Sequence, residues 1–170
     1  MVEKNYAHVD MGNQIDNSWN KDTAIALKIN KIGFSVKIRE RDKKKVEKRF
    51  IKTIKTRKDK RYNRKVVVII YSFLLYKLIK ESNGIAKRIK LCNDVSPAQD
   101  VHRYLDKICK FFEEPSVHST HNIKFKKKKD GNSKAHRFAN KVYKGRRKED
   151  YLLKGKDIDD LIEIIDKIIL

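Results

Sequence analysis

The sequence has little cysteine, no long apolar run and no internal repeat. Its two cysteines, Cys92 and Cys109, lie outside any CxxC motif and cannot build a disulfide framework, so we expect an intracellular protein, cytoplasmic or nucleoid/nuclear. Residues 1–6 lack the basic and apolar parts of a signal peptide. The longest apolar run covers residues 66–76, whereas a membrane-spanning helix needs about 20 residues. We therefore expect neither a secreted, a membrane-spanning nor a collagen-like protein.

Signatures of several well-defined sites are also missing. The sequence has no P-loop, no GxSxG motif and no glycine-rich dinucleotide fingerprint. His102, His118 and His121 have no further ligand at a regular spacing, so we expect no zinc site there.

Acidic residues are scarce relative to basic ones. The chain of 170 residues has 43 Lys and Arg but 22 Asp and Glu, for a net charge of +21. Apolar residues make up 39% of the chain, which is enough for one domain with a hydrophobic core. A charge of this size indicates a polyanionic partner, most often nucleic acid. The alternative is a compositional bias towards lysine.

The positive charge is concentrated in two blocks. Residues 31–65 have a net charge of +13 and residues 123–150 a net charge of +9, while the rest of the chain is nearly neutral. Two basic surfaces around a neutral core are typical of a protein that contacts phosphates. The alternative is that each block is a solvated edge or loop, which lysine protects from aggregation.

Hydrophobic periodicity predicts an α/β fold. We expect strands at 6–10, 23–29, 34–38, 89–94 and 122–128, and helices at 66–81, 96–114, 133–144 and from 157 onward. Residues 46–56 fit either a strand or a helix, because their apolar positions suit both periods.

Three motifs occur at matching places in this order of elements. They are residues 8–12 (HVDMG), residues 89–96 (IKLCNDVS) and residues 132–139 (NSKAHRFA). Together they resemble the first-strand, fourth-strand and last-helix motifs of the ribonuclease H family, with one extra residue before Gly12. The resemblance covers about residues 5–145 and implies a mixed five-stranded sheet flanked by helices, plus an extra C-terminal helix.

The resemblance also implies a catalytic site for cleavage of the RNA strand by metal-activated water. Asp10 and Asp94 would ligate two ions, Mg²⁺ or Mn²⁺, with Asp10 bridging them, and His136 would occupy the place of a further acid. The structural alternatives are that Asp10 opens a turn and that Asp94 caps the following helix.

Two departures from the family pattern weaken that implied site. The helical glutamate of the family would fall near Val68 or Ser72, where the sequence has no acid. His136 prefers softer ions than Mg²⁺. Glu40, Glu47 and Asp130 are the acids that could replace the missing ligands.

Basic residues that would contact the nucleic acid lie in three segments of the sequence. The list is Lys55, Arg57, Lys58, Arg61 and Arg64 in the connector, Lys126 and Lys128 near the fifth strand, and Lys134, Arg137 and Lys141 in the basic helix. They would contact phosphates, and 2′-hydroxyl groups would supply a preference for RNA/DNA hybrids or double-stranded RNA. Trp19 fits either stacking on a base or packing in its loop.

These observations predict a ribonuclease H-like domain over residues 1–150 and an amphipathic helix within 151–170. That helix would pack on the domain, on a protein partner or on a second copy. The expected function is binding of an RNA-containing duplex, with metal-dependent cleavage as an extension of it. The alternatives are a catalytically inactive binding or scaffolding module and a basic ribonucleoprotein component.

Overall fold

The computed structural model of the protein describes residues 6–15, 19–50, 60–92, 95, 98–126 and 133–169. The strands are β1 (Ala7–Gly12), β2 (Thr23–Ile29), β3 (Ile32–Ile38), β4 (Arg88–Leu91), β5 (Asn122–Phe125) and β6 (Tyr151–Leu152). The helices are α1 (Glu40–Phe50), α2 (Lys60–Glu81), α3 (Ala98–Phe111), α4 (Lys134–Tyr143) and α5 (Gly155–Ile169), and a 3₁₀ turn, η2, covers Val117–Ser119. None of these described helices has the length and apolar content needed to cross a membrane.

The strands form one mixed sheet in the order β5-β4-β1-β2-β3-β6. Strand β2 runs antiparallel to both of its neighbours, and the other three pairings are parallel. Each pair of parallel strands is joined by a long connection that contains at least one helix, as parallel pairing requires. The chain is therefore an α/β protein, as the periodicity predicts.

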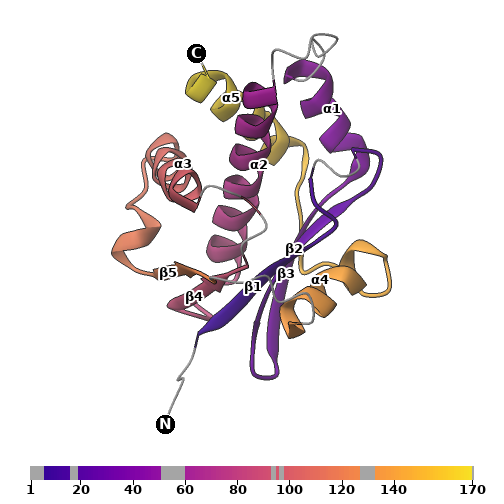
Figure 1. Ribbon diagram of the computed structural model, residues 1–170, viewed down its shortest axis with the longest axis vertical. Helices are drawn as coiled ribbons and strands as arrows, with labels where there is room; N and C mark the ends of the chain where they lie inside the picture. Colours follow the sequence, from indigo (N-terminus) through magenta and orange to yellow (C-terminus); the bar gives the residue numbers. More distant parts are fainter. Residues whose placement is uncertain are drawn as a thin grey trace.

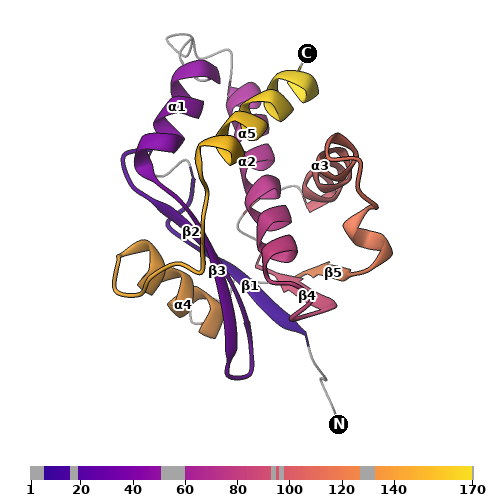
Figure 2. The ribbon, with the colours of Figure 1, turned by 180° about the vertical axis from the view of Figure 1, so that it is seen from behind.

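Helices cover both faces of the sheet (Figures 1 and 2). Helix α2 packs on β2, β3, α3 and α5, and these elements share one large apolar core. Helix α4 packs on β1, β2 and β3 from the other side, where a smaller core unites Ala24 and Ala26 with Phe138, Ala139 and Val142. Alternation along β2 directs Ile25 and Leu27 into the large core and Ala24 and Ala26 into the smaller one, whereas β1 adds apolar groups to the large core alone.

Helix α2 is buried on nearly all sides. Its β-branched run, residues 66–70, has a local preference for strand. The helix nevertheless begins at Lys60, six positions before the predicted start, and continues unbroken to Glu81. Residues 68–76 are all buried between the sheet, α3 and α5. Tertiary packing therefore overrides the local preference, as it does for helices in the centre of a domain.

The structure corrects the predicted number of strands and decides one segment that the sequence left open. Sequence patterning gave a five-stranded sheet, but β6 adds a sixth strand, parallel to β3. A strand of two residues is too short to show alternation. The ambiguous segment beginning at Val46 lies in α1 up to Phe50, and Val46 and Phe50 are buried together one helical turn apart. Residues 51–56 lie outside the described residues.

Candidate functional site around Asp10

Asp10 is a buried carboxylate in β1, on the face of the sheet that α4 covers. Its side chain is 3% exposed. One oxygen, Oδ1, accepts a hydrogen bond from the backbone N–H of Met11 at 2.8 Å, and the other, Oδ2, accepts one from Oγ of Ser133 at 3.0 Å. A buried carboxylate needs such partners, because an unpaired one is costly. Asp10 is thus held by its own strand and by the N-terminus of α4.

His136 faces the same carboxylate from the first turn of α4. Its Nδ1 lies 3.5 Å from Oδ1 of Asp10, and its Nε2 lies 2.9 Å from Nδ2 of Asn140. With Asn140 as donor, Nε2 accepts and Nδ1 carries the hydrogen that faces Asp10. The ring is half-buried, so one edge of this pair remains accessible to solvent. The arrangement places an acid and an imidazole side by side, each oriented by a further polar group.

Ser133 positions the start of α4 against the sheet. Its Oγ accepts a hydrogen bond from the backbone N–H of His136 at 3.0 Å, which is the N-cap contact. The same hydroxyl donates to Asp10, so one side chain both ends the loop and joins the helix to β1.

Gly12 lets α4 approach β1 closely. A Cβ atom at this position would lie 2.6 Å from the backbone carbon and oxygen of Ala139. No side chain fits there without moving the helix. Gly12, two residues after Asp10, therefore has a packing role, independent of any turn conformation.

The other acids expected for a metal site are not brought to Asp10 by the described residues. Asp94 and Asp130 lie outside the described residues. Strand β4 does end beside β1, because the N–H of Cys92 donates to the carbonyl of Val9 at 3.0 Å. Glu40 pairs with Lys44 on α1 at 2.5 Å, and Glu47 is half-buried on the same helix.

The helix positions where the family has a glutamate are filled by buried residues of other kinds. Val68 is 2% exposed, and Ser72 is fully buried, with its hydroxyl donating to the carbonyl of Val68 at 2.8 Å. Within the part of the chain that the structure describes, no group of three His, Cys, Asp or Glu is placed to bind a metal ion. These residues do not fit a two-metal site, and we derive no catalytic step through one.

The expected nucleic-acid contacts that the structure describes lie in three regions. Lys134, Arg137 and Lys141 are exposed along one side of α4, the helix that holds Asp10. Lys126 directly follows β5, and its N–H donates to the carbonyl of Leu91 at 2.8 Å. Arg61 and Arg64 are exposed at the start of α2. The remaining predicted contacts, Lys55, Arg57, Lys58 and Lys128, lie outside the described residues.

Sequence reasoning missed a row of basic side chains across the sheet. Lys28, His8, Lys90 and Lys124 occupy register positions on four adjacent strands, β2, β1, β4 and β5. Their neighbours along each strand point into the large core, so the row lies on the face that carries Asp10. We call this row, together with Arg88 and Lys126, the open sheet face. Each strand shows the alternation in sequence, but only the register brings the four residues together.

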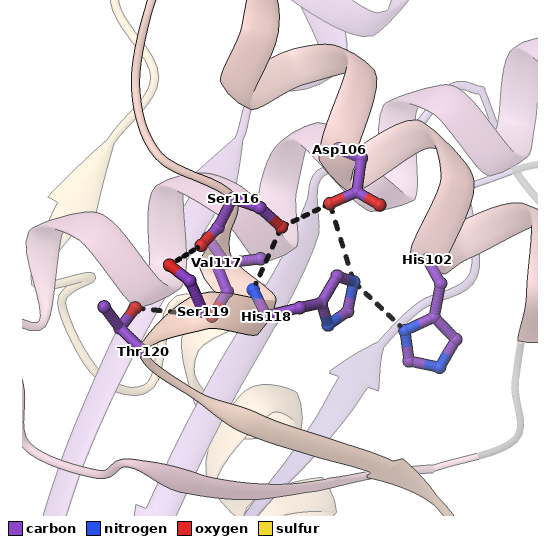
Figure 3. Close-up of polar contacts among 7 residues, drawn as sticks. All are labelled: His102, Asp106, Ser116, Val117, His118, Ser119 and Thr120. Carbon is purple, nitrogen blue, oxygen red and sulfur yellow. Dashed lines mark hydrogen bonds and ion pairs between the residues drawn. The ribbon is translucent and has the colours of Figure 1, made fainter.

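A second polar cluster lies between α3 and η2 (Figure 3). Nδ1 of His102 is 3.3 Å from Nε2 of His118, and that same Nε2 is 4.0 Å from Oδ1 of Asp106. Ser116 donates to Asp106 and accepts from the N–H of His118. Burial, followed by the nearby His118, lowers the pKa of His102 below its ordinary value. The cluster fastens η2 to α3, on the other side of the sheet from α4.

Trp19 packs in its own loop. Its ring contacts the large core, and Nζ of Lys43 lies 5.7 Å from the ring centroid. The packing alternative therefore accounts for this residue.

Comparison of the chain with protein-family models, with curated proteins and with solved structures found no match.

Proposed function

We propose that this chain is a ribonuclease H-like domain that binds RNA-containing duplexes, RNA/DNA hybrids above all. The observation that carries the proposal is the contact between two motifs far apart in sequence. The hydroxyl of Ser133 hydrogen-bonds Asp10 across a separation of 123 positions, and His136 faces the same carboxylate. The resemblance predicts that the first-strand and last-helix motifs share one site, and these contacts support it.

Charge around that contact supports a polyanionic partner. Exposed cations follow α4 from Lys134 to Lys141, and the open sheet face brings further cations to the same side. Phosphate contacts of this kind give affinity without reading sequence. An RNA-containing duplex adds 2′-hydroxyl groups in a wide, shallow minor groove, which polar side chains can recognise.

Salt dependence of binding tests the proposal. A fluorescently labelled RNA/DNA hybrid is titrated with the protein between 50 and 200 mM salt, beside RNA and DNA duplexes of the same sequence. We expect a steep loss of affinity, on the order of 10³-fold for six phosphate contacts, and tighter binding to the RNA-containing duplexes. The double variant Arg137→Ala, Lys141→Ala should reduce the log–log slope by about 1.8, whereas Lys107→Ala, Lys110→Ala on α3 should leave it unchanged.

A slope near zero for the wild-type protein would contradict the proposal. Equal affinity for all three duplexes would favour the alternative of a basic ribonucleoprotein component.

Hydrolysis of the RNA strand, which the resemblance implies, is a second candidate function. The described residues bring Asp10 and His136 together but do not complete a metal site, so cleavage there would need a further ligand from outside them. The same hybrid is incubated with the protein in Mg²⁺ and in Mn²⁺, with Asp10→Asn as the control, and the RNA strand is followed on a gel. Cleavage that Asp10→Asn abolishes would support hydrolysis at this site. Tight binding without cleavage would identify an inactive binding module. Cleavage that survives Asp10→Asn would come from another site or a contaminant.

A further inference from the structure

No helix among the described residues covers β4 and β5 on the side of the sheet that carries Asp10. Helix α4 packs on β1, β2 and β3 on this side, and Figures 1 and 2 show no described helix over β4 and β5 there. Lys124 and Arg88 are exposed, and Lys90 is half-buried between them. This part of the open sheet face is therefore accessible to a ligand that approaches Asp10.

The open sheet face is poor in acids. Some basic side chains elsewhere pair with acids, as Lys37 does with Asp22 at 2.9 Å and Arg103 with Asp100 at 2.7 Å. Among the described strand residues that point to the open sheet face, Asp10 is the only acid. Adjacent strands lie about 4.8 Å apart, so the row from Lys28 to Lys124 spans roughly 14 Å. A row of that length can meet more than one phosphate.

Tyr6 organises the cations of β4 and β5. Nζ of Lys90 lies 4.8 Å from the centroid of its ring, and the charged groups of Arg88 and Lys124 each lie 6.0 Å from it. A ring face attracts cations, and these contacts hold three mutually repelling groups over the same spot. The cations are thus arranged before any ligand binds, which lowers the entropy cost of binding.

A hollow of about 570 Å³ lies at the N-terminal ends of β4 and β5, and Lys87, Arg88, Thr120 and His121 are among the residues that line it. No carboxylate lines it within the described residues. Burial, with the charge of Lys87 as a further cause, lowers the pKa of His121. The hollow is cationic, but η2 lines it from the α3 side of the sheet, so it is not part of the open sheet face.

The hollow and Asp10 lie at opposite ends of β4. Arg88 begins the strand, and Val9 pairs with Leu91, so Asp10 is level with Cys92. Four residues of strand cover about 13 Å. Arg88 and Asp10 therefore mark the two ends of the open sheet face along β4.

We propose that the open sheet face is the track for one strand of the bound duplex, with Arg88, Lys90 and Lys124 around Tyr6 as its phosphate contacts. This inference rests on the proposed function. It assigns the strand path to β4 and β5 rather than to the basic connector at 55–65.

The test compares two pairs of lysines that differ in position alone. Lys90→Gln, Lys124→Gln removes two charges from the track and keeps most of the side-chain stems, while Lys107→Gln, Lys110→Gln removes two exposed charges from α3. Hybrid affinity is measured by fluorescence anisotropy at several salt concentrations, and thermal melting verifies that each variant is folded. We expect the track variant to bind roughly tenfold more weakly with a slope reduced by about 1.8, and the α3 variant to match the wild type.

The possible failures are distinguishable. If the wild-type protein binds the hybrid but the track variant binds equally well, or if both variants weaken binding to the same extent, the strand path is wrong and the proposed function stands. If the wild-type protein does not bind the hybrid, the proposed function fails and the strand path fails with it.

Discussion

Replacing Gly12 with valine should lower the free energy of unfolding by roughly 3 kcal/mol, at the upper end of the range for an overpacked core. The first added carbon alone would lie 2.6 Å from the backbone of Ala139. Valine otherwise suits a strand, so the expected loss comes from the steric contact and not from β propensity. Urea denaturation followed by circular dichroism measures the change.

The matched control for Gly12 is Gly155, at the start of α5. A Cβ atom there meets nothing within 4 Å. Gly155→Ala should therefore change the free energy of unfolding by about 0.5 kcal/mol or less, or stabilise the protein slightly. If the two substitutions shift stability equally little, α4 does not pack on β1 as closely as the structure indicates.

Replacing Asp157 with alanine should cost about 3 kcal/mol of stability. Asp157 pairs with Lys77 at 2.7 Å, and the two side chains are 9% and 12% exposed. It also accepts hydrogen bonds from the hydroxyl of Tyr151 at 3.0 Å and from the N–H of Lys154 at 2.8 Å. Its loss leaves the Lys77 charge buried without its acid and releases α5 from α2. Thermal and urea unfolding measure the effect.

An exposed pair on the same helix provides the control for Asp157. Lys167 and Glu163 lie 2.8 Å apart, with side chains 62% and 55% exposed. Glu163→Ala should cost at most about 0.5 kcal/mol, because such pairs contribute little. Equal losses for the two substitutions would show that burial does not strengthen the Lys77–Asp157 contact.

The contribution of Asp157 should depend on pH in the acid range. Burial pushes the pKa of Asp157 upward, but hydrogen bonds from Lys154 and Lys77 outweigh burial and hold it below the ordinary value. A carboxyl group with a lowered pKa stabilises the folded state above its ordinary pKa, and that stability is lost as pH falls through the folded-state pKa. The stability difference between wild type and Asp157→Ala should therefore be full at pH 7 and should shrink below about pH 4.

Most of the fold follows from local patterns in the sequence. The strand predicted at 23–29 has the bounds Thr23–Ile29 in the structure, and the predicted helix at 133–144 is found as Lys134–Tyr143. Two elements, α1 and β6, could not be predicted from local patterns. Helix α1 has apolar positions that suit either period, and only its packing against α5 decides between them. Strand β6 is held by its neighbour β3, which no local pattern reveals.

The site was predictable only in part, because the pairing register of the strands decides which residues lie side by side. Asp10 and His136 came from motifs, and the structure brings them within 3.5 Å. The N-cap position of Ser133 was predictable, because serine is a preferred N-cap residue and stands at the start of a predicted helix. The alignment of His8, Lys90 and Lys124 could not have been found from the sequence, because it depends on how β1, β4 and β5 pair.

The central claim is that a nucleic-acid duplex binds the side of the sheet that carries Asp10. Backbone amide chemical shifts of the ¹⁵N-labelled protein, recorded during titration with a short RNA/DNA hybrid, test it most directly. We predict shifts at Asp10, Lys90, Lys124 and along α4, and none at Lys107 and Lys110 on α3. Shifts concentrated on α3 and α5, or no shifts at saturating hybrid, would contradict the account.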